Sequence, residues 1–153
     1  MNFTKLKHLE YKIHNEIPMT KLMNLSINTM DDDFFTTKAP LDININDKGS
    51  AFGGSLSSIA IISSWCLVKI ISDDLGFDDC DILVIKNEST FKKQVTKDIY
   101  CKCVVPTVDE INTLKEKLQN KNSASIKINA SIVQEDYICM DYEGVYVIKK
   151  KES

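Results

Sequence analysis

Arginine is absent from the 153-residue chain, so all nineteen basic residues are lysines. A bidentate guanidinium clamp on a phosphate or carboxylate is therefore excluded, and any anion site must use lysine or backbone N–H groups. The net charge of −3 argues against nucleic acid as a partner. Long hydrophobic runs are also missing. The most apolar segment, residues 59–71, contains Ser63, Ser64 and Lys69 and is shorter than the roughly 20 residues of a membrane span.

Cysteine is present, but its pattern excludes two common uses. The five cysteines are odd in number and lack the short repeated spacings of a disulfide framework or a zinc site. Cys101 and Cys103 lie two residues apart in a predicted strand, so their side chains point to one face and cannot pair easily. The first eighteen residues contain no apolar core of a signal peptide. We therefore expect free thiols, no metal site and a cytoplasmic location.

Hydrophobic periodicity predicts an alternation of helices and strands. Residues 1–17 form an amphipathic helix that ends at Pro18, and residues 53–75 form a long helix that stops at Gly76. A third helix begins at Thr107, with Glu110 placed for a capping box. The strands are expected within residues 19–32, 34–41, 80–95, 98–106, 124–136 and 137–150.

The long helix is the key to the fold. It is apolar almost all round, so it must be enclosed by other elements rather than laid on a surface. Six strands are available to wrap it, and this combination describes the α+β hotdog fold, in which a six-stranded antiparallel sheet wraps around one central helix. At 153 residues, without a linker or repeat, the chain is expected to form a single domain over residues 1–153. Ser63 and Ser64 are interpreted as helix-packing residues.

The start of the long helix carries a family resemblance. The loop from Asn46 to Gly54, with the sequence NDKGSAFGG, resembles the Asn-x-x-Gly-x-x-His-Gly-Gly loop of hotdog thioesterases of the phenylacetate-pathway type. The wider segment 39–65 is more similar to the hotdog domain at the C-terminus of bacterial YiiD-type proteins. That group is described as a thioesterase and is associated with malonyl-acyl-carrier-protein decarboxylation. The resemblance covers nearly the whole chain in the order of its elements.

The resemblance implies a site at the paired glycines. The N–H groups of Gly53 and Gly54 would form an oxyanion hole for a thioester carbonyl, or the glycines only permit close packing. Asn46 would orient the substrate, or it only shapes a turn. Asp47 is a candidate hydrolytic base. The residues expected to contact substrate are Asn44, Gly49, Ser50, Phe52, Ser55 and Ile61.

Two departures from the hydrolase pattern shape the functional expectation. Phe52 replaces the usual histidine, and Ile61 stands where such hydrolases carry a carboxylate on the central helix. Decarboxylation of a malonyl thioester needs an oxyanion hole and a site that excludes water, but no such base. This reaction is therefore favoured, as a step that initiates fatty acid synthesis. The alternatives are a thioesterase and a non-catalytic acyl-thioester-binding protein. The expected partner is an acyl carrier protein or coenzyme A thioester, which brings its own pantetheine arm, so no separate cofactor is expected. A homodimer or a dimer of dimers would close the open sheet edges.

Overall fold

In the computed structural model, which describes residues 2–152, the apolar segment after the paired glycines forms α3 (Gly53–Asp74). Its 22 residues correspond to a length of about 33 Å. Gly76 follows with a φ of +86°, a left-handed conformation that glycine adopts without steric cost and that ends the helix. The long helix predicted from the sequence is therefore present.

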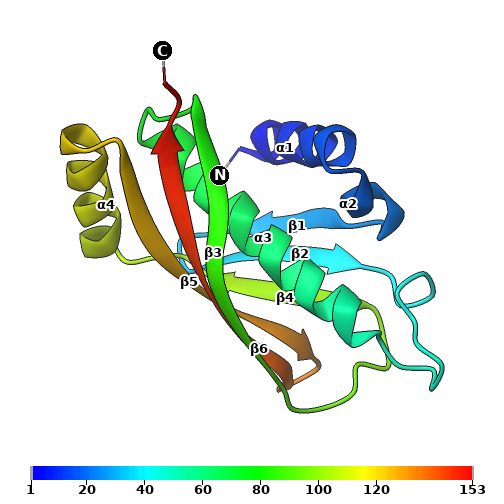
Figure 1. Cartoon of the computed structure of the whole chain (residues 1–153). Helices are drawn as coiled ribbons and strands as arrows, with labels where there is room; N and C mark the ends of the chain where they lie inside the picture. Colours follow the sequence, from blue (N-terminus) through cyan, green and yellow to red (C-terminus); the bar gives the residue numbers. More distant parts are fainter. Residues whose placement is uncertain (1, 153) are drawn as a thin grey trace.

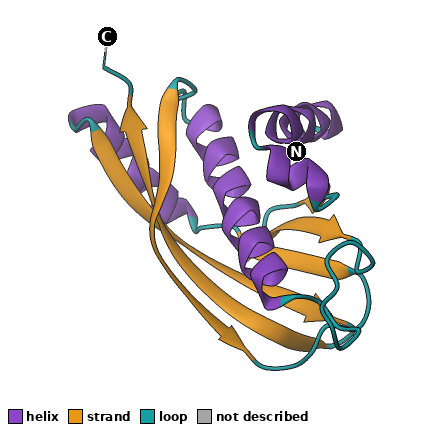
Figure 2. Cartoon of the chain, turned by 45° about the vertical axis from the view of Figure 1, so that its right-hand side comes forward, coloured by secondary structure: helices purple, strands orange, loops and turns teal. Residues whose placement is uncertain are grey.

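Six antiparallel strands surround this helix (Figure 1). They lie in one sheet in the order β1-β2-β4-β5-β6-β3, which leaves β1 and β3 at the two edges. Figure 2 shows that the sheet curves and that α3 crosses its concave side. The predicted α+β hotdog architecture is confirmed. The strands are β1 (Ser26–Met30), β2 (Phe34–Ala39), β3 (Cys80–Phe91), β4 (Ile99–Val104), β5 (Ser123–Gln134) and β6 (Tyr137–Lys150).

The core lies between α3 and the concave face of the sheet. Ile59 and Leu67 of α3 are fully buried, as is Ile132 of β5. By length and composition alone, α3 could cross a membrane, yet most of the helix is buried inside the protein. It is the core helix of the domain and not a membrane span.

The N-terminal segment differs in part from the sequence prediction. α1 (Phe3–Glu16) ends before Pro18 as expected, but a second short helix, α2 (Pro18–Leu22), replaces the start of the predicted strand, so β1 begins only at residue 26. Proline at the first helical position costs no hydrogen bond and already has a helical φ. The Thr20 hydroxyl also donates to the carbonyl oxygens of Ile13 and Ile17, at 2.9 and 2.8 Å, and so ties α2 to α1.

The remaining helix, α4 (Val108–Asn120), packs against β5. Thr107 and Glu110 form the predicted capping box, in which each side chain accepts a hydrogen bond from the other residue's backbone N–H. Leu114 and Leu118 form its buried face. α4 thus covers part of the sheet away from the paired glycines and contributes no candidate residue to the site.

A line of hydrogen-bonded polar side chains lies beneath the middle of α3. The Ser63 hydroxyl is 2.7 Å from Thr37 Oγ1, and Ser64 Oγ is 3.8 Å from Cys103 Sγ. The Tyr146 hydroxyl donates to the carbonyl oxygen of Ile61 at 2.7 Å and lies 2.8 Å from the Tyr142 hydroxyl. Ser63 and Ser64 thus pack α3 onto the sheet. All five cysteines are free thiols, with Cys66, Cys101, Cys103 and Cys139 buried and Cys80 half-buried.

Candidate active site

The turn before α3 is organised by the side chain of Asn46. Its amide nitrogen donates to Ser50 Oγ at 2.9 Å and to the carbonyl oxygen of Ala51 at 3.3 Å. Its oxygen accepts from the backbone N–H groups of Lys48 and Ser50 at 2.8 and 3.2 Å. Gly49, with a φ of +81°, completes the turn. Both ends of the Asn46 amide are therefore engaged within the loop, which fits its interpretation as a turn-shaping residue.

The neighbouring candidates Asn44 and Asp47 lie on opposite sides of this loop. Asn44 is only 2% exposed, and its amide donates to the carbonyl oxygens of Met23 and Pro40 at 3.0 and 2.8 Å. Asn44 thus ties the loop to the backbone at Met23 and Pro40, and it has no amide hydrogen left for a substrate. The Asp47 side chain is 81% exposed and forms a 3.0 Å ion pair with Lys48. Asp47 is accessible, but it lies at the tip of the turn.

The first turn of α3 presents unpaired backbone donors. Phe52 is the N-cap residue in an extended conformation, and its own N–H donates to the carbonyl oxygen of Asn44 at 2.8 Å. Within residues 2–152 no side chain caps this helix end. The first N–H groups of a helix have no partner inside it, and they carry a partial positive charge of about half an elementary unit. Gly53 and Gly54 therefore present N–H groups that can hold a developing oxyanion.

Each of the two glycines lies against an aromatic ring. A methyl group on Gly54 would collide with the ring of Phe52, which folds back over the first turn of its own helix. A methyl group on Gly53 would lie 3.6 Å from the ring of Phe91, which comes from the end of β3. The glycine at position 54 therefore lets the Phe52 ring lie across the helix end. Position 53 has room for a side chain, so its glycine is not required by packing within this chain.

One face of α3 stays partly open, although the apolar pattern predicts complete enclosure. Ser58 is exposed, and Ser57, Ile61 and Trp65 are half-buried along the same face as Gly54. Trp65 donates its indole N–H to the carbonyl oxygen of Ile82 in β3 at 3.0 Å, which fixes this face beside the edge strand. The position expected for a hydrolase carboxylate, Ile61, is thus on the open side of the helix. Ser55 is half-buried in the first turn, whereas Ser50 is buried in the loop.

Edge strand β3 brings residues to this face that the sequence reasoning did not select. A register shift between Val84 and Lys86 leaves Ile85 without a partner, and after it Asn87, Ser89 and Phe91 lie opposite the inward-facing residues Gly144, Tyr142 and Met140 of β6. Directly opposite residues in an antiparallel pair share a face. The extra residue breaks the alternation along residues 80–91, and for that reason the pattern alone does not show which side chains face the helix.

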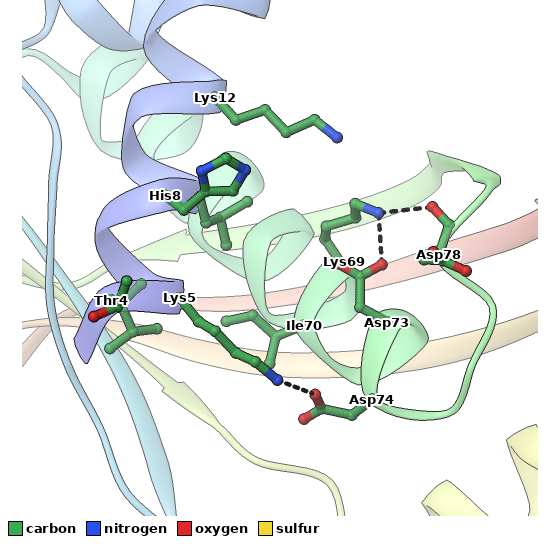
Figure 3. A pocket seen from close by; sticks show the side chains of 11 residues that line it. Thr4, Lys5, His8, Lys12, Lys69, Ile70, Asp73, Asp74 and Asp78 are labelled. Atoms are coloured by element: carbon green, nitrogen blue, oxygen red, sulfur yellow. Dashed lines mark hydrogen bonds and ion pairs between the residues drawn. The ribbon is translucent and has the colours of Figure 1, made fainter. Parts of the chain in front are cut away.

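A cavity of about 540 Å³ lies at the other end of α3, between α1 and the C-terminal turn of the helix (Figure 3). Its wall carries charges of both signs that pair with one another: Lys5 lies 3.8 Å from Asp74, and the largely buried Lys69 lies 2.6 Å from Asp73. The residues that line it are Thr4, Lys5, Leu6, His8, Leu9, Lys12, Lys69, Ile70, Asp73, Asp74 and Asp78. None of the candidate residues at the paired glycines contributes to it.

Comparison with known proteins places this arrangement in a class. A putative thioesterase from Shewanella oneidensis has the same fold, with a TM-score of 0.85, 24% identity, and coverage of 94% of this chain and 96% of that chain. A mutant thioesterase from Pseudomonas aeruginosa also shares the fold, with a TM-score of 0.67, 10% identity, and coverage of 94% and 93%. A protein with unknown function from Chlorobaculum tepidum TLS gives a TM-score of 0.89, 27% identity, and coverage of 95% and 94%. The fold is that of the hotdog thioesterases.

The particular family follows from the sequence. Residues 6–150 match the family described as "Putative thioesterase (yiiD_Cterm)". The match covers most of the chain, so the protein belongs to the YiiD C-terminal-domain family, as the resemblance of its loop indicates. No curated protein matches the sequence.

Proposed function

We propose that the protein is a thioesterase that hydrolyses an acyl thioester carried by coenzyme A or an acyl carrier protein. The single observation that carries this proposal is the uncapped first turn of α3, where Gly53 and Gly54 present backbone donors at an accessible helix end. Membership of a family described as a thioesterase supports the reaction type. Because of this family membership, we rank hydrolysis above the decarboxylation that the sequence alone favours.

In the proposed reaction the thioester carbonyl lies at the first turn of α3. Water attacks the carbonyl carbon, and the oxyanion of the tetrahedral intermediate accepts hydrogen bonds from the Gly53 and Gly54 N–H groups. Collapse of the intermediate breaks the C–S bond, which releases a carboxylic acid and the thiol of the carrier. Removing one donor from such a site costs about 10²–10³-fold in rate.

The water must lose a proton during this attack. Asp47 is the candidate base because its carboxylate is exposed and lies on the loop that precedes the helix. Its ion pair with Lys48 would have to open for this role. Asn46 keeps the loop in shape and in that way positions Asp47 and the helix end.

Decarboxylation of a malonyl thioester is the second candidate, and one observation favours it. Ile61 leaves the open face of α3 without a carboxylate, so the substrate's own carboxylate would meet no like charge there. The C–C bond to the carboxylate breaks, CO₂ leaves, and the resulting enolate is held by the same N–H groups before it takes a proton from water. The step needs no side-chain base.

One assay separates the two reactions. The protein is incubated with acetyl-, hexanoyl- and malonyl-coenzyme A, and the release of free thiol and of CO₂ is measured in parallel. Hydrolysis releases thiol from the acyl thioesters without CO₂, whereas decarboxylation releases CO₂ and leaves the thiol esterified. Binding without either product would support the non-catalytic alternative and contradict the proposal.

The site is proposed to function in a homodimer. β3 is an edge strand of twelve residues, and it exposes Leu83, Val84 and Ile85 beside the open face of α3. A long apolar edge strand of this kind favours pairing with a strand of another chain. A second copy paired along β3 would cover these side chains and complete the walls of the site at the first turn of α3. A cytoplasmic location, where coenzyme A and carrier-protein thioesters are made, is part of the same proposal.

A further inference from the structure

The cavity at the C-terminal end of α3 separates two helices that share few polar contacts. In the second half of α1, the Glu10 carboxylate accepts a hydrogen bond from the Ile27 N–H of β1 at 2.7 Å. In the first half, the only ion pair with α3 within residues 2–152 is the exposed pair of Lys5 and Asp74, at 3.8 Å. The space between the two helices, about 540 Å³, is within the range of small-molecule sites.

Apolar side chains form one part of the cavity lining. Leu6 and Leu9 of α1 are each 7% exposed, and Ile70 of α3 is 8% exposed. Small-molecule sites typically combine such an apolar surface with a few polar groups that fix the orientation of the ligand. The polar groups of this cavity therefore decide which ligand it can bind.

Lys69 is the most deeply buried charged residue of the lining, with 8% of its surface exposed. Its ammonium group donates to Asp73 Oδ1 at 2.6 Å and to the carbonyl oxygen of Asp78 at 3.0 Å (Figure 3). A lysine ammonium group has three N–H donors, so one of them has no acceptor within residues 2–152. Because Lys69 lines the cavity, this remaining donor is available to a bound acceptor.

Two further charged groups of the lining have no ion-pair partner in the described part of the chain, residues 2–152. They are the Lys12 ammonium group and the Asp78 carboxylate. Figure 3 shows the Lys12 side chain extending from α1 toward the side of the cavity that holds Lys69 and Asp78. Two ammonium groups that face one space repel each other, and an anionic group between them would remove this repulsion.

The charges of the lining also restrict the net charge of a ligand. Apart from His8, the charged residues are three lysines and three aspartates, and their charges cancel: Lys5, Lys12, Lys69, Asp73, Asp74 and Asp78. Complementary charges favour a ligand without net charge that nevertheless carries an anionic and a cationic group. A zwitterion with an apolar part meets both conditions.

We propose that this cavity is a second ligand site, which binds a free amino acid with an apolar side chain. The carboxylate of the amino acid accepts hydrogen bonds from Lys12 and from the remaining N–H of Lys69. Since Lys69 contacts the main chain of Asp78, this placement holds the α-ammonium group, one carbon away, close to the Asp78 carboxylate. The side chain of the amino acid packs on the apolar part of the lining.

The proposed ligand site is separate from the thioester site. It lies at the opposite end of α3 from Gly53 and Gly54, and none of its lining residues belongs to β3. In Figures 1 and 2, α1 and β3 lie on opposite sides of α3. A second copy paired along β3 would therefore leave this cavity open.

The test measures binding of L-leucine, L-methionine and L-phenylalanine to the full chain by isothermal titration calorimetry. 4-Methylpentanoate and 3-methylbutylamine serve as half-ligands, because they carry only the carboxylate or only the ammonium group of leucine. We expect at least one of the three amino acids to bind at millimolar concentration or below. Each half-ligand should bind about 10-fold or more weakly than leucine, since each lacks one set of charged hydrogen bonds.

Variants locate the binding in the cavity. Lys12→Met and Asp78→Asn keep the approximate size of the side chain and remove its charge, so each should weaken amino-acid binding about 10-fold or more. Lys115→Met on α4 and Asp136→Asn, between β5 and β6, make the same changes on exposed residues away from the cavity and should bind like the wild type. Circular dichroism checks that each variant is folded.

Three results would overturn the proposal, and none of them depends on thioester turnover because the readout is binding. They are the absence of binding for all three amino acids at millimolar concentration, a half-ligand that binds as tightly as leucine, and unchanged affinity in both Lys12→Met and Asp78→Asn. Binding that needs both ligand charges and is lost in these two variants, but not in the controls, would support the site.

Discussion

The Asn46 side chain organises the loop that precedes the candidate site. Its amide makes two donor and two acceptor contacts inside the turn, all with residues between Lys48 and Ala51. The loop resemblance selects Asn46 as a candidate site residue. Sequence alone leaves its role open between orienting the substrate and shaping the turn, because both roles need the same amide. In the folded loop, the four hydrogen bonds of the Asn46 amide favour the turn-shaping role.

Replacing Asn46 tests this role directly. Asn46→Ala removes four loop contacts, so we expect the free energy of unfolding to fall by about 1–3 kcal/mol and turnover to fall with it. Asn46→Asp keeps the two acceptor contacts but loses both donors, so it should recover part of the stability. Urea unfolding and thioester turnover are measured on the same samples, with Asn120→Ala on the surface of α4 as control. A strong loss of turnover at unchanged stability would instead assign Asn46 to substrate orientation.

Buried thiol and phenol groups give the protein a predictable response to alkaline pH. Burial raises the pKa of the Cys66 thiol and that of the Tyr146 hydroxyl well above their ordinary values. Both groups stay protonated in the folded protein, while in the unfolded chain they ionise near pH 8.5 and 10. Their contribution to stability is therefore complete below these values and is lost as pH rises beyond them.

We accordingly expect the free energy of unfolding to fall above about pH 8.5, by up to about 1.4 kcal/mol per pH unit for each such group. Urea unfolding at pH 7.5, 9 and 10 with a reducing agent measures this slope. In Cys66→Ala the fall between pH 8.5 and 10 should be shallower. A stability that does not change between pH 7.5 and 10 would contradict the assignment.

α3 illustrates both what sequence patterns reveal and where they fail. Its length and its end at Gly76 follow from the run of apolar residues and the glycine signal. Its partly open face does not follow from the apolar pattern, because Trp65 resembles a core residue in any apolar helix and only the loop resemblance places Ile61 toward a substrate. Only the position of edge strand β3 shows that they lie at the border of the core. The short helix α2 is not predicted, because residues 19–22 directly precede the alternating segment and are included in the predicted strand.

The open face makes Ile61 a test of which reaction takes place. Ile61→Asp adds a carboxylate where the loop resemblance expects the carboxylate of a hydrolase, and the Tyr146 contact to the Ile61 main-chain oxygen remains possible. If the reaction is decarboxylation, CO₂ release from malonyl-coenzyme A should fall about 10-fold or more, because like charges repel strongly where water is excluded. Thiol release from uncharged acyl thioesters should be kept or raised. Ile61→Asn has the same shape without the charge and serves as control. If neither activity responds to the charge, Ile61 does not face the substrate.

As a whole, the molecule was largely predictable from its sequence, and its site only in part. The helix and strand order sufficed for the hotdog fold, because few arrangements enclose one long apolar helix. The paired glycines located the helix end correctly. The position of Phe91 beside Gly53 is not predicted, since the two residues lie far apart in the chain and are brought together only through the pairing of β3 with β6. Contacts of this kind depend on register, which a broken alternation conceals.

The exposed edge of β3 leads to a prediction for the assembly. We expect light scattering at micromolar concentration to give at least twice the protomer mass of 17.3 kDa. Leu83→Lys combined with Ile85→Lys should yield monomers, because lysine on an edge strand opposes strand pairing. Val108→Lys, at a 74% exposed position on α4, should leave the mass unchanged. A monomeric wild type would contradict both the assembly and the site that we propose at its interface.

The bulge at Ile85 decides which side chains of β3 lie on the inner face of the sheet. With Ile85 outside the ladder, Asn87, Ser89 and Phe91 lie on the face toward α3; if Ile85 were instead paired opposite Val145, strict alternation would turn Lys86, Glu88 and Thr90 inward. The strand would still have β-forming composition and could still pair with β6. A substitution that closes the bulge without changing the length of the chain is therefore a route by which descendants of this gene could exchange an inner face that carries Phe91 for one that carries charges, without remaking the rest of the domain.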